Sequence, residues 1–266
     1  MSIVLKENEW AEQMISLKAM GDSPPTTLRR IARYFIDKGY SKKGVIRELE
    51  LFLYRYDPDV SIPKWWNTIE KAFKSAQKNP AINIESIPIY AEELDVIGKL
   101  KSVQLQRLAF TLLCLSKYWN IIRRKDNYWV NSPNSEIMKL ANIKTSFKNQ
   151  CILYNHLYER GLIELSKKVD STNVRVCFAY GNGEPVMNIT DFRNLGYQYM
   201  YYCGGDFIEC ENCGLITKIS SKDGNRRKQR YCPECATEIM LKQNVESVMR
   251  LRNVKKMLDV GSLQGA

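Results

Sequence analysis

The sequence predicts a mainly α (α+β) protein, and three observations predict this fold class. Apolar residues recur at helical spacing over much of the first 160 residues, for example over 42–54 and 104–119. One pair of neighbouring segments, 162–169 and 173–180, alternates apolar and polar residues as the strands of a hairpin do. Near the C-terminus, two Cys-x-x-Cys pairs with 18 residues between them predict a small module built around a metal ion.

Composition limits the number of modules and the kind of partner. At about 100–200 residues per domain, the 266 residues predict two or three modules. The net charge is +11, of which residues 1–100 contribute +1, residues 101–206 contribute +6 and residues 207–266 contribute +4. The basic excess therefore lies after residue 100, and this part of the chain is expected to contact an anionic partner.

Breaks in the periodicity divide the chain into five predicted segments. They are a helical domain at 1–80, a linker at 81–103, a helical unit with the hairpin at 104–182, a connector at 183–206, and the cysteine module with a basic helix at 207–266. Within the linker, residues 82–90 are compatible with a short strand. The longest strongly apolar stretch is too short to span a bilayer, so no membrane partner is expected. Without an export signal, cysteines are expected as thiols or metal ligands.

The N-terminal third predicts three helices, Leu28–Lys38, Lys42–Tyr54 and Lys64–Gln77. With the Gly-Tyr turn at 39–40 and the late Ser-Ala at 75–76, this order is similar to the small helical domain found C-terminal to some phage and plasmid primases. No primase catalytic domain accompanies it, so primase activity does not carry over. A generic three-helix bundle explains the same pattern.

The central segment predicts helices at Gln104–Trp119, Glu136–Ala141 and Ser146–Arg160, followed by the hairpin. This order, with Gly161-Leu-Ile entering the hairpin, resembles the winged helix-turn-helix family. The resemblance implies that the third helix enters the major groove of DNA and that the hairpin, or wing, touches the backbone. A winged helix used for protein contacts is the alternative.

For this chain, the resemblance implies that two groups of residues contact nucleic acid. Asn and Gln suit adenine edges, while lysine and arginine suit phosphates. The groups are Lys144, Ser146, Lys148, Asn149 and Gln150 around the third helix, and Lys167, Lys168 and Arg175 in the wing. Phe147, Ile152, Leu153 and Leu157 are expected in the core, as are Cys114, Cys151 and Cys177.

The cysteine pairs predict one structural Zn²⁺ held by Cys210, Cys213, Cys232 and Cys235, because four thiolates close a tetrahedral site. Four free cysteines in a small core are the alternative. The segment resembles treble-clef and zinc-ribbon fingers. A hairpin of 215–219 with 229–231 is expected between the pairs, and a long helix after them.

The segment between the cysteine pairs is strongly basic. Such a loop, pinned by a metal, suits contacts to phosphates that position a nucleic acid; a solvated charged loop is the alternative. Its basic residues are Lys222, Arg226, Arg227, Lys228 and Arg230. The helix that follows could also serve in dimerisation or docking, and the oligomeric state stays open.

As a whole, the chain resembles phage and prophage proteins of low-GC Gram-positive bacteria, through the segments RLAFTLLCLSKYW, ITDFRNLGYQYMYY and CENCG…RYCPEC. The resemblance implies a mobile-element protein in the cytoplasm of a bacterial host.

The sequence predicts a nucleic-acid-binding protein, with duplex DNA as partner, that acts in replication initiation or gene regulation. It is expected to be no enzyme, since one His and the absence of any Glu-x-Lys or Asp-x-Lys oppose nuclease chemistry. The alternative is a phage inhibitor or adaptor that acts on a host protein complex.

Overall fold

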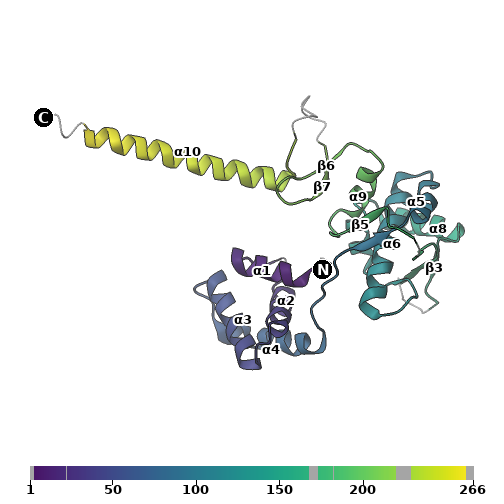
Figure 1. Ribbon diagram of the computed structural model, residues 1–266, viewed down its shortest axis with the longest axis horizontal. Coiled ribbons are helices and arrows are strands. Elements are labelled where there is room, and N and C mark those ends of the chain that lie inside the picture. The colour runs from purple at the N-terminus through teal and green to yellow at the C-terminus, as the bar shows by residue number, and fades with distance from the viewer. Residues whose placement is uncertain (1–2, 22, 168–172, 182, 220–228, 262–266) are drawn as a thin grey trace.

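The computed structural model describes residues 3–21, 23–167, 173–181, 183–219 and 229–261, with side chains up to Leu251 (Figure 1). The described residues form ten helices and three small antiparallel sheets. The mainly helical class predicted from the sequence is thus confirmed. Within the described part of the chain, none of the helices has the combination of length and apolar character that a bilayer crossing requires.

The first four helices form a bundle with its own core. They are α1 (Glu7–Leu17), α2 (Pro24–Asp37), α3 (Lys42–Tyr56) and α4 (Ile62–Lys78). The buried faces of α2, α3 and α4 carry the aliphatic and phenylalanine residues that the periodicity picks out, among them Leu28, Leu49 and Phe73. The three helices expected here are confirmed, and α1 is added to them.

The central unit is arranged around α6 (Val103–Arg123), which is buried over most of its circumference. Because α6 is apolar on nearly all sides, other elements can pack around it rather than against one stripe. Its helical neighbours are α5 (Ala91–Gly98), α7 (Asn134–Leu140), α8 (Phe147–Glu159) and α9 (Leu195–Tyr202).

Three small sheets complete the described structure. In the first, β1 (Ile87–Ile89) pairs with β5 (Met187–Ile189). In the second, β4 (Val174–Val176) lies between β2 (Trp129–Val130) and β3 (Ile163–Leu165). In the third, β6 (Phe207–Glu209) pairs with β7 (Ile216–Lys218).

The segments expected as a linker, 81–103, and as a connector, 183–206, differ from that prediction. They supply β1, α5, β5 and α9, and these elements lie in the same core as α6. The pairing of Ile87 with Ile189 joins residues about a hundred positions apart. Strand β1 falls within residues 82–90, where a short strand is expected, but local periodicity cannot identify a pairing partner so distant in sequence.

One buried ion pair fixes the segment before α6 to the end of the hairpin. The Lys117 ammonium donates to the Glu93 carboxylate and to the Pro88 carbonyl, both at 2.7 Å. The other carboxylate oxygen of Glu93 accepts from the Tyr180 backbone N–H at 2.7 Å. Glu93 is wholly buried, and burial lowers the pKa of Lys117. The pair therefore ties α5 and α6 to the residues after β4.

Candidate metal centre and nucleic-acid interface

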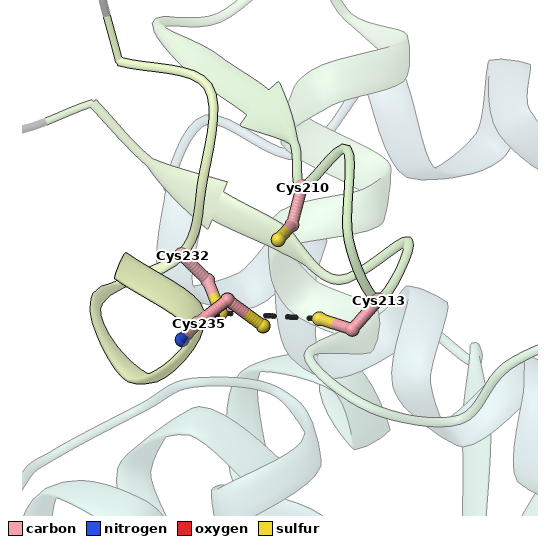
Figure 2. Close-up of side chains that lie close together, drawn as sticks. All are labelled: Cys210, Cys213, Cys232 and Cys235. Carbon is pink, nitrogen blue, oxygen red and sulfur yellow. Dashed lines mark hydrogen bonds between the residues drawn. The ribbon is translucent and has the colours of Figure 1, made fainter. Parts of the chain in front are cut away.

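The four predicted metal ligands come together where the β6–β7 hairpin meets the start of α10 (Pro233–Gly261) (Figure 2). Their sulfur atoms all lie within 4.8 Å of one another. The Cys213 and Cys232 sulfurs are 3.8 Å apart. A tetrahedral ion with metal–sulfur bonds of about 2.3 Å requires sulfur separations of about 3.8 Å. The cluster can therefore hold one metal ion with little rearrangement.

The first pair is presented by a tight turn that joins β6 to β7. The Gly214 N–H donates to the Cys210 carbonyl at 2.8 Å, and the Cys210 N–H donates to the Leu215 carbonyl at 3.0 Å. Gly214 has φ of +68°, a left-handed conformation that glycine adopts without strain. This turn brings Cys210 and Cys213 to one side of the hairpin.

The second pair lies at the first turn of α10, where backbone N–H groups point toward the sulfurs. The Cys235 N–H donates to the Cys232 sulfur at 3.4 Å, and the Asn212 amide donates to the Cys235 sulfur at 3.3 Å. Burial raises the pKa of Cys210, but hydrogen bonds from the backbone of Cys232, Cys213 and Asn212 outweigh it and bring that pKa down to about 6. The surroundings thus favour at least one thiolate before any metal binds.

The strand pairing predicted between the two cysteine pairs is wrong. Segment 215–219 pairs with β6 rather than with 229–231, so the hairpin encloses the first cysteine pair. Arg230 makes a two-pronged ion pair with Glu211, with nitrogen–oxygen distances of 2.6 and 2.7 Å. Much of its charge is therefore already compensated. Lys222, Arg226, Arg227 and Lys228 lie outside the described residues.

Side-chain amides connect the hairpin to the central unit. Asn194, at the start of α9, donates to the Ile216 carbonyl of β7 at 3.0 Å. Asn142, in the turn between α7 and α8, donates to the Asn194 side-chain oxygen at 2.9 Å and accepts from the Tyr197 N–H at 3.2 Å. Arg193 also donates to the Cys213 carbonyl at 2.8 Å. The metal ligands and the start of α8 are therefore linked through α9, a link that the sequence analysis missed.

Two polar residues expected at nucleic acid, Ser146 and Gln150, make hydrogen bonds within the protein at the start of α8. The Ser146 hydroxyl accepts from the Asn149 N–H at 3.4 Å and so caps the helix. The Gln150 amide accepts from Asn134 at 2.6 Å and donates to the Thr145 carbonyl at 3.1 Å. Asn149 is exposed, and its amide donates to the Thr145 hydroxyl at 3.1 Å. Ser146 and Gln150 thus position the helix.

The basic residues around α8 and the hairpin divide into two kinds. Lys144, Lys148 and Lys167 are exposed. Arg175 is exposed too, but it pairs with Glu164 across the β3–β4 hairpin at 3.2 Å. Lys168 lies outside the described residues. Three lysines thus present positive charge here, while the arginine is partly neutralised.

The outer face of α8 is more apolar than expected. Phe147 is 75% exposed and Ile152 is 45% exposed, and Cys151 and Cys177 are exposed as well. The prediction that these residues lie in the core is wrong, whereas Cys114, Leu153 and Leu157 are buried as expected. Because Leu153 and Leu157 define the buried stripe, positions 147 and 152 fall about 100° or more away from it around the helix.

Comparisons with protein-family models, with curated proteins and with solved structures find no match for this chain. Function must therefore be inferred from the chemistry of the cysteine cluster and from the surface around α8.

Proposed function

We propose that this chain is a non-catalytic, nucleic-acid-binding protein in which a zinc-containing finger supports a winged helix on duplex DNA. Four cysteine sulfurs suit a tetrahedral ion, and Zn²⁺ is the common ion in such a site. With all four positions filled by protein, the ion has no open site for water or substrate. Its role is therefore to fold the hairpin and to fix the start of α10.

The winged-helix part of the proposal is supported by the element order. Helix α6, strand β2, helices α7 and α8, and strands β3 and β4 follow one another, and β4 pairs with both other strands. A winged helix has this order. In such a fold α8 takes the position of the recognition helix, and the β3–β4 hairpin is the wing.

The observation that carries DNA binding is the exposure of Lys144 and Lys148 beside the capped N-terminus of α8, with Lys167 in the wing. Lysine ammonium groups and a helix N-terminus both favour phosphate. Since Gln150 is engaged internally, contacts to phosphates dominate this mode and Asn149 is the candidate for a base edge. The basic loop at 222–230 adds phosphate contacts near the finger.

The biological setting in this proposal is a phage or mobile element acting in a bacterial cytoplasm, in replication initiation or gene regulation. It rests on the sequence resemblance described above. A protein that recruits or positions other factors on DNA needs no catalytic group of its own, which agrees with the non-catalytic proposal.

The double charge reversal K144E/K148E tests the DNA-binding proposal. Each lysine that contacts phosphate releases about one counterion, so the slope of log affinity against log salt should fall by about two. Fluorescence anisotropy with labelled duplex at several salt concentrations measures this slope. The control K64E/K71E makes the same charge change at exposed lysines of α4. Equal losses in both variants, or loss in neither, would exclude α8 as the DNA-binding element.

A second function is favoured by one observation, the 75% exposure of Phe147 and the 45% exposure of Ile152 on α8. Large apolar side chains left in contact with water suit a protein partner better than phosphate. The chain would then be an adaptor or inhibitor that binds a host or phage protein complex through α8. Phe147→Ala should abolish capture of a partner that survives nuclease digestion, while K144E/K148E should leave capture intact. The reverse pattern supports DNA binding.

A further inference from the structure

Residues 193–197, at the start of α9, contact the finger beside the first cysteine pair. The Arg193 guanidinium donates to the Cys213 carbonyl at 2.8 Å, and the Asn194 amide donates to the Ile216 carbonyl at 3.0 Å. Both acceptors belong to the backbone of the hairpin, one in the turn between β6 and β7 and one in β7 itself. The two bonds therefore require a folded hairpin.

The same segment contacts the turn between α7 and α8. The Asn194 side-chain oxygen accepts from the Asn142 amide at 2.9 Å, and the Asn142 side-chain oxygen accepts from the Tyr197 N–H at 3.2 Å. A Cβ atom at Gly196 would lie 2.1 Å from the Ala141 carbonyl oxygen, so the two backbones are in direct contact there. The side chain of Asn194 thus donates to the finger and accepts from the α7–α8 turn.

The α7–α8 turn carries one of the lysines proposed to contact phosphate. Lys144 lies two residues after Asn142 and is exposed. The next residue, Thr145, is fixed to α8, because its hydroxyl accepts from the Asn149 amide and its carbonyl accepts from the Gln150 amide, both at 3.1 Å. A change in how Asn142 is held should therefore reach Lys144 and the first turn of α8.

A second support of the turn does not involve the finger. Arg107, on α6, donates to the Ala141 carbonyl at 2.9 Å and also to the Asn142 carbonyl. With this support in place, loss of the finger should loosen the turn without unfolding it. The expected effect on α8 is therefore a graded change of several fold.

We propose that metal occupancy of the four cysteines regulates DNA binding by α8, with Asn194 and Asn142 as the positioning residues that carry the effect. The inference rests on the proposed function and adds regulation to it. One ion at four thiolates would hold the turn of the hairpin, and with it the Cys213 and Ile216 carbonyls. The buried apolar cluster among the described residues of the finger consists of cysteines, so without an ion the hairpin lacks a core and both bonds to α9 are lost. Metal and duplex DNA then favour the same arrangement of the turn, and each should raise the affinity of the chain for the other.

Hydrogen exchange of the full chain with and without metal tests the link in the absence of DNA. Chelation should speed exchange over residues 143–150 about threefold to tenfold, since about one supporting hydrogen bond is lost. Exchange over residues 105–118 of α6 should stay the same, because these residues belong to the core of the central unit. Equal exchange over residues 143–150 in both metal states overturns the proposal.

Asn194→Asp separates coupling from a merely structural role. The carboxylate can still accept from Asn142 but cannot donate to the Ile216 carbonyl, so most of the metal dependence should disappear. A merely structural role would instead speed exchange equally in both metal states and preserve their ratio, and that result overturns the proposal. Asn188→Asp is the matched control: it makes the same change at an exposed residue of β5 and should keep the metal dependence.

The double variant K144E/K148E tests whether the link reaches DNA. It should weaken duplex binding at least about threefold more in the metal-loaded chain than in the chelated chain, because metal helps to place these lysines. Comparing the two losses cancels the contribution of the basic loop at 222–230. Equal losses in both metal states overturn regulation through α8. A chain that binds no duplex in either state overturns the proposed function as well, whereas the exchange experiment still decides the metal-dependent link.

Discussion

The central unit and the finger are stabilised by different physical interactions. Thirty buried apolar residues form the core around α6. In the finger, the buried apolar cluster among the described residues consists of three metal-ligand candidates, Cys210, Cys232 and Cys235. Hydrophobic burial therefore suffices for the first region but not for the second. A metal ion at the four cysteines, as proposed, would supply the stability that the finger lacks, so the two regions should respond differently to the same treatment.

The largest effect should come from removing one metal ligand. Cys232→Ser should release the ion and unfold the finger, since the binding free energy of structural zinc in small fingers is about 10–16 kcal/mol. The core around α6 should keep its protection. Metal analysis of the purified chain and hydrogen exchange, compared between residues 207–218 and 105–118, measure both parts.

Cys203→Ser is the matched control, because Cys203 is exposed and is not part of the cluster. Unchanged metal content in Cys232→Ser would contradict the four-cysteine site. Simultaneous loss of the core around α6 would contradict the independence of the two regions.

Lys117→Met should have the next largest effect and should act on the central unit. It leaves the wholly buried Glu93 carboxylate without its cation, at a cost of about 3–5 kcal/mol. Chemical denaturation measures the loss. Lys242→Met removes a cation from an exposed ion pair and should leave stability almost unchanged. Similar losses in the two variants would show that burial does not determine the strength of the Glu93–Lys117 pair.

Gly196→Ala should separate α9 from the turn between α7 and α8. A Cβ atom at Gly196 would lie 2.1 Å from the Ala141 carbonyl oxygen, so backbone must move. The expected cost is about 1–3 kcal/mol, measured by thermal unfolding. Gly98→Ala has open space around the added methyl group and should be neutral or stabilising. A neutral Gly196→Ala would mean that α9 does not pack closely there.

Asn194→Gly should have the smallest effect and should act where the two regions meet. Glycine keeps the left-handed backbone, φ of 53°, but removes the hydrogen bonds to Asn142 and Ile216. At about 1 kcal/mol per hydrogen bond, β7 should exchange amide protons faster while the melting temperature of the central unit changes little. Unaltered exchange in β7 would show that the amide link does not support the hairpin.

Spacing and periodicity predict those parts of the molecule that depend on near neighbours in sequence. The metal ligands follow from two short motifs, and helices α3 and α8 start within one residue of the expected positions because Ser41 and Ser146 cap them. The antiparallel pairing of segments 162–169 and 173–180 is confirmed by β3 and β4.

Features that depend on distant partners could not be predicted in this way. Strand β1 requires β5, and the burial of Glu93 requires Lys117 and Tyr180. The hydrogen bonds of Gln150 could not be predicted for a related reason. Its residue type suits adenine, but Asn134, sixteen residues earlier, comes close enough to engage the amide. Residue type indicates what a side chain can bind, while packing decides what it does bind.

The buried ion pair also limits how this chain can exchange parts with other proteins by recombination. A crossover at residue 104 would keep Lys117 and discard Glu93, leaving a cation in an apolar interior. A crossover at residue 183 would discard β5, the pairing partner of β1. Apart from Leu5, which lies in the same core, the buried residues of that core run from Ile87 to Tyr199, so this block must be inherited together. Crossovers are expected to be tolerated best outside this block.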